Sequence, residues 1–584
     1  MNPPSNDPNA SKSPPQAPGP REELQKKTVR REKRLDGTAF IGELPIWRLL
    51  FKFSLPAIGT FICLALYSVL DPIFLGNAES GVYLIGALTV NYPVDSIQQG
   101  VSQLVTIGAC TFLGRALGQK DLALAERALG SAITLSFILT CILIAITVPL
   151  LDPLLILFGA TPEILPHGHI YGMITICGSW AKILPTLLAA TMRTEGKMFL
   201  SMVIVISASI GTVILEAIFV IACKLGALGS AMATIIAQVG LVGQWVELYV
   251  VNACVRQDCA VCVVRSHTSG SWHGTAALTL FFFYVIGRTS VKFKWRSLWP
   301  DWKLVGRMIA LGSAGLLMAI ATVSALVVIL RCLTTWSDPT QTNDTLAAYG
   351  AFEKLIFFSL IPASGLCQGV IPIAAFNYGA KKPARLASLL RWAILYVVVV
   401  STVFFIILEA ATWPLLAMMG GHETMMAVGQ PAIRISVAAL PIVGIFMIVS
   451  AFFQGVGRAL PANFLAILRQ AVLLIPLALG LSNAMQSAIG VWMAFPISDA
   501  ITVVVSLTMV TTCYRFLWSR PRAPAPPPSV VANPLSVAQR PLSAAEMLQA
   551  GHAPPRNEVE ILNTNNKAAP NSQCGPLGRR GQAQ

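Results

Sequence analysis

The chain has 584 residues, of which 55% are hydrophobic and only 12% are charged, and its mean hydropathy is +0.67. A soluble protein carries about 25% charged residues, so this composition excludes an ordinary water-soluble globular protein. The net charge of +15 does not indicate nucleic-acid binding, because most Lys and Arg lie in the terminal segments or in short loops between apolar runs.

Two polar tails enclose a long apolar region. Residues 1–44 and 518–584 are rich in Pro, Ser and charge, and we expect both to be disordered. Between them, apolar runs recur that are long enough to cross a hydrocarbon core of about 30 Å. The sequence predicts an all-α polytopic membrane protein with twelve transmembrane helices, at residues 46–75, 82–114, 128–157, 168–192, 199–223, 226–287 (interrupted), 303–332, 345–376, 386–417, 426–455, 461–483 and 487–517.

The loop charges predict the orientation. Loops after even-numbered spans carry basic residues such as Arg115 and Lys381, whereas loops after odd-numbered spans carry mainly acidic residues and His, such as Glu79 and Asp338. Basic loops stay in the cytoplasm, so both termini are predicted to be cytoplasmic. The membrane is predicted to be the plasma membrane or that of an organelle.

An internal repeat divides the spans into two halves. Shifting the sequence by 261 residues superimposes GQKDLALAERAL on GAKKPARLASLL and MRTEGKMF on FQGVGRAL. The repeat predicts an N-lobe at residues 45–250 and a C-lobe at residues 303–517. Because six is an even number of spans, the lobes have the same orientation, and a substrate cavity is expected between them.

Residues 251–302 interrupt this pattern. They contain the end of the sixth span, a cytoplasmic linker and a polar piece that fits neither a lipid-facing helix nor an ordered loop. Two interpretations remain for residues of about 245–280: a real insertion or an error in the gene model. Cys254, Cys259 and Cys262 lie here, but the spacing to the nearby His residues is too short for a zinc module, and no metal site is predicted.

Few acidic residues lie inside the spans, and two of them are predicted at similar depth. Counted at 1.5 Å per residue from the outer helix ends, Asp71 lies about 7 Å, Glu216 about 10 Å and Thr234 about 12 Å deep. Thr212 lies four residues before Glu216 on the same helix face. These four residues predict a cation-coupling site. The alternatives are a helix-end cap for Asp71, snorkelling for Glu216 and bonding of each Thr to its own helix.

Polar residues on the second and eighth spans are candidates for the wall of the substrate cavity. Amide side chains inside a membrane also commonly bond to neighbouring helices, so both roles remain open. The candidates are Asn91, Gln98, Gln103, Glu353 and Gln368.

Three stretches resemble the MATE (multidrug and toxic compound extrusion) transporters, in particular their MepA- and DinF-like branch. They are SQLVTIGACTFLGRALGQKDLALAERALGS, FSLIPASGLCQGVIPIAAFNYGAKKPARL and AFFQGVGRALPANFLAILRQAVLLIPLAL. The resemblance extends over about residues 45–517, apart from the interruption. It implies a V-shaped pair of six-helix lobes that exchange a proton or sodium ion for an organic substrate.

The resemblance also implies roles for the predicted coupling residues. The family's first-helix aspartate matches Asp71, and its N-x-x-x-D-P element falls on Thr212 to Ala217, with Glu216 in place of Asp. A following G-x-x-x-A-T element keeps Thr234. The departures preserve an acid and a hydroxyl but weaken the expectation of a sodium site.

The sequence therefore predicts a secondary active multidrug efflux transporter that works by alternating access. The expected coupling ion is H+ or Na+, with no other cofactor, and the expected substrates are small organic molecules, cationic or amphipathic. We expect a monomer in the lipid bilayer, without nucleic acid. The chain has no P-loop and no nucleophile with a histidine partner, so an enzyme is not predicted. A flippase for lipid-linked oligosaccharides, from the same superfamily, is the alternative, and it would require several Arg or Lys in its cavity.

Overall fold

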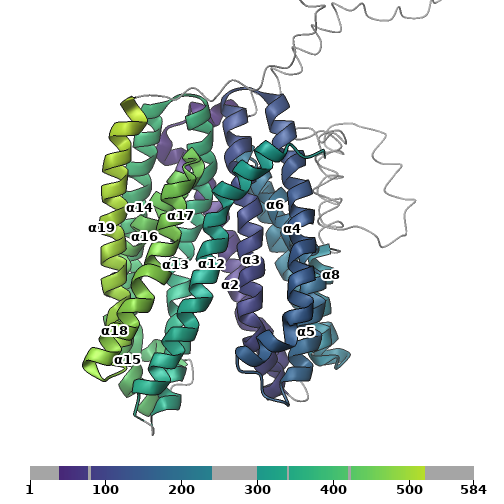
Figure 1. Ribbon diagram of the computed structural model, residues 1–584, viewed down its shortest axis with the longest axis vertical. Coiled ribbons are helices and arrows are strands. Elements are labelled where there is room, and N and C mark those ends of the chain that lie inside the picture. Colours follow the sequence, from purple (N-terminus) through teal and green to yellow (C-terminus); the bar gives the residue numbers. More distant parts are fainter. Residues whose placement is uncertain (1–37, 77–80, 240–298, 339–340, 419–422, 520–584) are drawn as a thin grey trace, which may run out of the picture. The chain divides into compact units, whose positions relative to one another are not determined.

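The computed structural model describes residues 38–76, 81–239, 299–338, 341–418 and 423–519. The described residues form helices and no strand (Figure 1). After the short helix η1 (Phe40–Gly42), the N-lobe comprises α2 (Ile46–Gly76), α3 (Gly81–Gly118), α4 (Leu122–Leu157), α5 (Leu165–Cys177), α6 (Ser179–Thr194), α7 (Met198–Glu216), the π-helix η2 (Ala217–Ala222) and α8 (Gly226–Val239).

The C-lobe follows in the same order. Its helices are α12 (Trp302–Trp336), α13 (Thr342–Gly379), α14 (Pro383–Met418), α15 (Glu423–Val437), α16 (Leu440–Val456), α17 (Ala459–Ile467), the π-helix η4 (Leu468–Leu474), α18 (Ile475–Met485) and α19 (Ile489–Ser519).

Element boundaries repeat at the predicted offset. Helices α3 and α13 begin and end 261 residues apart, and so do α4 and α14. The same offset relates the left-handed backbone positions Lys120 and Lys381, with φ of 60° and 54°, and Gly196 and Gly457, with φ of 84° and 73°. The predicted tandem arrangement of two lobes is confirmed.

Most of the predicted spans have counterparts in the structure. Among the described residues, nine helices are long and apolar enough to cross a membrane, and the bent pairs α5–α6 and α15–α16 raise the number to eleven. Helix α8 is a shorter apolar helix at the start of the predicted sixth span. The remainder of that span, both predicted tails apart from residues 38–44 and 518–519, and nearly all of the predicted insertion lie outside the described residues.

The two bent spans break at equivalent positions. The bend is 45° at Gly178 in the N-lobe and 49° near Ala439 in the C-lobe, 261 residues later. In the C-lobe, Pro441 explains the break, because proline lacks an N–H and its ring clashes with the carbonyl four residues earlier. That carbonyl belongs to Val437, where α15 ends.

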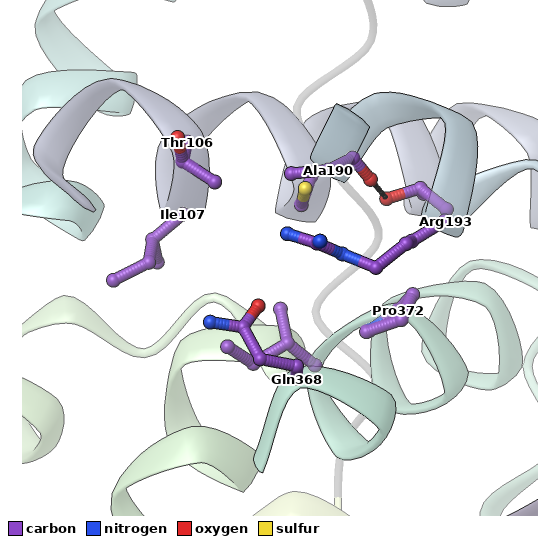
Figure 2. Close-up of a pocket in the computed structure, with 9 residues that line it drawn as sticks. Thr106, Ile107, Ala190, Arg193, Gln368 and Pro372 are labelled. Atoms are coloured by element: carbon purple, nitrogen blue, oxygen red, sulfur yellow. Dashed lines mark hydrogen bonds between the residues drawn. The ribbon is translucent and has the colours of Figure 1, made fainter. Parts of the chain in front are cut away.

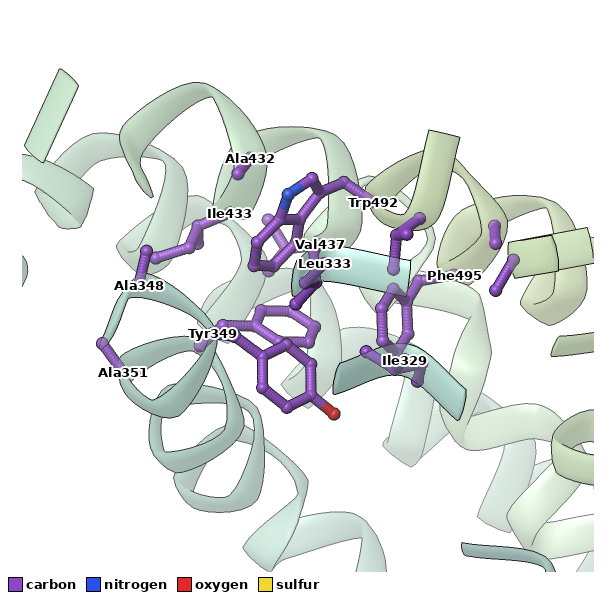
Figure 3. Close-up of a cluster of buried hydrophobic side chains, with 14 of the residues drawn as sticks. Ile329, Leu333, Ala348, Tyr349, Ala351, Ala432, Ile433, Val437, Trp492 and Phe495 are labelled. Atoms are coloured by element: carbon purple, nitrogen blue, oxygen red, sulfur yellow. The ribbon is translucent and has the colours of Figure 1, made fainter. Parts of the chain in front are cut away.

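A dense aromatic cluster holds the C-lobe together. Trp492 of α19, only 2% exposed, packs on Tyr349 and Phe352 of α13 with ring centroids 6.0 and 5.6 Å apart, and Phe495 lies 5.0 Å from Phe352. Figure 3 shows Trp492 and Phe495 against Tyr349, with Ile433 and Val437 completing the cluster. These contacts attach the last helix to the helix that faces the other lobe.

Backbone-to-backbone packing joins the lobes in one half of the membrane. Gly312 of α12 lies against the carbonyl oxygen of Leu104 in α3, and Gly118 lies against that of Phe376 in α13, so neither position has room for a Cβ. Helices α3 and α13 end in this half, and α12 begins in it. By the loop charges it is the predicted cytoplasmic half.

Candidate functional site

Two carboxyl groups from different helices meet inside the N-lobe. Asp71 comes from α2, five residues before the helix ends at Gly76, and Glu216 is the last residue of α7, where η2 begins. The exposed fractions are 5% and 0%. Ser230 of α8 lies between them, with its Oγ 3.1 Å from Asp71 Oδ1 and 2.9 Å from Glu216 Oε1.

The two carboxyl groups share one hydroxyl, because Ser230 Oγ lies within hydrogen-bonding distance of both. Glu216 Oε2 has no donor among the described residues. A hydroxyl has one hydrogen to donate and ionised carboxylates only accept hydrogen bonds, so Ser230 can bond to both groups only if one of them carries a proton. A small cation is the other way to hold two carboxylates together. The cluster has the chemistry of a site for a proton or a small cation.

The two predicted hydroxyls occupy different places around this cluster. Thr234 lies one turn from Ser230, donates to the Ser230 carbonyl oxygen at 3.1 Å and lies 3.2 Å from the hydroxyl of Tyr67. Thr212 donates to its own helix at Ala208, 3.0 Å away. Neither hydroxyl bonds to a carboxylate in this state.

Sequence reasoning missed Ser230 and Tyr67. Both are four residues from a residue that had been identified: Ser230 precedes Thr234, and Tyr67 precedes Asp71. Residues four apart share a helix face, so extending the search by one turn finds both.

A cavity of about 210 Å³ lies beside the cluster. Tyr67 and Thr212 belong to its wall, which connects the cavity with the coupling residues. Gln103 of α3 and Gln368 of α13 line it as well, and their contact with substrate stays a prediction. Most of the wall comes from α2, α6 and α7, and much of it is apolar.

The other predicted wall residues lie elsewhere. Asn91 is 2% exposed and donates to the Gly168 carbonyl of α5 at 3.0 Å, and Gln98 donates to Ser179 of α6 at 2.5 Å, so both join neighbouring helices. Glu353 accepts from the Tyr349 hydroxyl at 2.8 Å, outside the cavity lining.

A second, smaller pocket continues toward the lobe interface. It has room for about one water molecule, at about 10 Å³, and shares Arg193 and Gln368 with the larger cavity. Figure 2 shows the Arg193 side chain extending between α3 and α13, with Gln368 on the opposite wall. Arg193 therefore lies where the N-lobe cavity meets the C-lobe.

A family model described as MatE matches residues 56–218 and 319–480, one match in each lobe and together more than half of the chain. The chain belongs to the MATE family. MATE proteins are transporters rather than enzymes, and the predicted resemblance is confirmed.

Curated relatives match nearly the full length of this MATE protein's membrane region. The multidrug export protein MepA of Staphylococcus aureus (strain N315) is 24% identical over 473 residues, which covers 81% of this chain and 95% of the relative. MepA of Staphylococcus saprophyticus is 21% identical over 465 residues, with coverages of 80% and 93%.

Solved structures agree with the fold. An outward-facing conformation of a multidrug resistance MATE family transporter has a TM-score of 0.70 at 17% identity, covering 83% of this chain and 99% of that one. A MOP superfamily transporter from Pyrococcus furiosus also scores 0.70 at 17% identity, over 82% and 98%. These likenesses confirm the all-α MATE fold. The family and the apolar helices show a multi-pass integral membrane protein.

Proposed function

We propose that this MATE transporter is a secondary active multidrug exporter that exchanges small organic molecules for protons, with sodium as the alternative ion. The observation that carries the proposal is the meeting of Asp71 and Glu216 at the Ser230 hydroxyl, which lies within hydrogen-bonding distance of both. One proton completes this cluster, whereas a sodium ion would need further oxygen ligands. The threonine hydroxyls, which bond elsewhere, do not supply them.

A short chain of contacts supports coupling between the ion and the substrate. Tyr67 and Thr212 line the cavity, Tyr67 lies against Thr234, Thr234 bonds the backbone of Ser230, and Ser230 holds both carboxyl groups. Protonation changes the hydrogen bonds available at the carboxyl pair. A rearrangement there reaches the cavity wall through Ser230, Thr234 and Tyr67.

The packing between the lobes supports alternating access. We propose that the described state is closed on the cytoplasmic side, where Gly312 and Gly118 contact the facing helices, and that the lobes rock apart there after a cation binds. The loop charges support the cytoplasmic placement of this side and of both termini.

The relatives' names support multidrug export, and the cavity bears on the kind of substrate. Lys182 and Arg193 line it without an acidic residue among the lining residues. Of the two predicted classes, we therefore propose amphipathic rather than simply cationic substrates. The flippase alternative has limited support, because Lys182 and Arg193 are the only basic side chains among the described residues that line the cavity.

Efflux from proteoliposomes tests the exchange. The reconstituted full-length protein is loaded with an organic dye, and a proton gradient and a sodium gradient are imposed separately. We expect acid outside to accelerate dye release and sodium at equal pH to have no effect. Release driven by sodium alone would assign sodium as the ion, and release that responds to neither gradient would refute the exchange.

The Asp71→Asn variant tests the site in the same assay. We expect gradient-driven release to fall to the background, because the coupling carboxyl is lost, while membrane insertion stays intact. Asp152→Asn is the matched control, since Asp152 is 52% exposed on α4 and pairs with His169. Unchanged transport in Asp71→Asn would remove Asp71 from the mechanism.

A further inference from the structure

Arg193 carries a charge in the protein interior with almost no partner. It lies in the last turn of α6, and its one hydrogen bond to a described residue runs from Nη1 to Ser201 Oγ at 3.4 Å. No Asp or Glu within the described ranges forms an ion pair with it. A guanidinium has five N–H donors, so most of its donors remain available.

Other interior arginines of this chain have their partners. Arg469 pairs with Asp499 at 2.5 Å, Arg115 donates to the Val456 carbonyl, and Arg385 bonds to several carbonyl oxygens, including that of Leu44 at 2.7 Å. A charge inside a membrane protein without a partner is costly, and such residues commonly mark substrate pathways. Arg193 differs from these three arginines, because it has neither a carboxylate nor a carbonyl partner among the described residues.

The surroundings of Arg193 have the polarity of an anion site. The described residues of the cavity wall include two cationic side chains, Lys182 and Arg193, and no carboxylate. Lys182 is partly compensated, because Asp95 lies 3.6 Å from its Nζ and Gln98 accepts from it at 2.9 Å. Arg193 is therefore the uncompensated positive charge of the cavity.

Two further features define what the ligand would look like. Gln368 reaches the same space from α13 of the other lobe, opposite Arg193 (Figure 2), and its side-chain amide carries two N–H donors besides its oxygen. The adjoining wall is apolar, with Phe61 and Leu64 from α2 and Ile204 from α7. A ligand with an apolar body and one anionic end would fit this combination of a cation, an amide and an apolar wall.

We propose that Arg193 and Gln368 bind the anionic group of an amphipathic substrate, such as an organic carboxylate, while its apolar body occupies the N-lobe cavity. The proposal rests on the proposed export function and specifies its substrate class. A guanidinium binds a carboxylate through two parallel hydrogen bonds. Gln368 belongs to the C-lobe and Arg193 to the N-lobe. When the lobes separate on the predicted cytoplasmic side, the two residues move apart and the anion site opens for a substrate to enter.

Equilibrium binding to the purified full-length protein tests this site. The probes are dansylglycine, which carries a carboxylate, and its neutral methyl ester, which has the same apolar body. We expect the wild type to prefer dansylglycine. Arg193→Gln should weaken dansylglycine binding about 10- to 100-fold, as the loss of a charge-assisted pair requires, and leave the ester within about twofold. Gln368→Ala should weaken dansylglycine less.

Two further variants show whether a loss of binding comes from the lost contact or from misfolding. Arg193→Lys restores the charge and should recover part of the lost affinity, and Arg434→Gln is the matched control, because Arg434 is 45% exposed and lies on α15 away from the cavity. If Arg193→Gln weakens both probes equally, or neither, the anion site is refuted. Equal binding of both probes by the wild type would refute it as well.

Competition distinguishes the source of the anion. Displacement of dansylglycine by free organic carboxylates supports a soluble substrate, and displacement only by vesicles that contain phosphatidic acid assigns the same anion site to a lipid phosphate. Gradient-driven release of the ester tests the exchange function separately. If the gradient does not drive release of the ester, the exchange proposal is refuted. The anion site is then still decided by comparing the binding of dansylglycine with that of its ester.

Discussion

Arg469 and Asp499 form a buried ion pair between η4 and α19. Their side chains are 14% and 8% exposed, Nε lies 2.5 Å from Oδ1, and the guanidinium also lies 5.5 Å from the Phe446 ring. The Ser498 hydroxyl donates to the Arg469 carbonyl at 2.8 Å. The ion pair and this hydrogen bond together attach η4 to α19.

Asp499→Asn should lower the free energy of unfolding by about 3–5 kcal/mol, because it leaves a buried arginine without its countercharge. Thermal unfolding of the protein in detergent measures the change. Glu409→Gln is the control: its pair with Arg434 at 3.3 Å is more than 40% exposed on both sides, and such surface pairs contribute about 0–1 kcal/mol. Equal losses of stability in Asp499→Asn and Glu409→Gln would contradict the stabilising role of the buried ion pair.

At the scale of elements, the short helix η1 connects the two lobes. Phe40 stacks near Phe53 of α2 with centroids 6.4 Å apart, and Lys52 lies 4.3 Å from the Phe40 ring. From the C-lobe, Lys382 donates to the Gly42 carbonyl at 2.9 Å, and Arg385 donates to several carbonyl oxygens of the segment that includes η1, among them that of Leu44. This segment therefore stabilises the state in which the lobes meet on the η1 side.

Arg385→Ala should loosen η1 and favour opening on that side. The loss of about 1.4 kcal/mol of hydrogen bonding would raise amide hydrogen exchange in residues 38–45 and 370–379 about tenfold. Mass spectrometry of exchange measures this effect. Arg391→Ala is the control, because Arg391 is an exposed residue on the same helix. Unchanged exchange in Arg385→Ala would show that η1 does not hold the lobes.

At the scale of the whole molecule, the lobes close through contacts between backbones. The carbonyl oxygen of Leu104 occupies the space that a Cβ on Gly312 would need. Small residues at such positions let helices approach closely in membranes. Any larger side chain at residue 312 opposes closure without touching the coupling carboxyls.

Gly312→Val should therefore reduce transport. Overpacking at this contact costs about 1–3 kcal/mol, which moves the population away from the closed state by about 5- to 150-fold. The proteoliposome assay should detect slower release, with probe binding retained. Gly306→Val is the control on the same helix, since a Cβ at Gly306 meets nothing within 4 Å. Equal transport by the two variants would contradict a closing role for the Gly312 contact.

Hydropathy, loop charge and the repeat determined the all-α membrane fold and the two-lobe arrangement, because these properties depend on residue type and spacing along the chain. The motifs around Gly118 and Gly379 sufficed to predict the family. The position of Asp71 in an apolar run also identified it as a candidate from the sequence alone, and its role in coupling stays a prediction.

Only the tertiary structure decided which side chains meet. The bridge through Ser230, the bonding of Asn91 and Gln98 to neighbouring helices, and the isolation of Arg193 depend on how helices rotate and pack against one another. A serine or an amide inside an apolar span has the same sequence pattern whether it faces a carboxylate, a backbone carbonyl or a cavity. Its partner lies far away in the chain, 159 residues away for Ser230 and Asp71, and is therefore determined by packing rather than by local spacing.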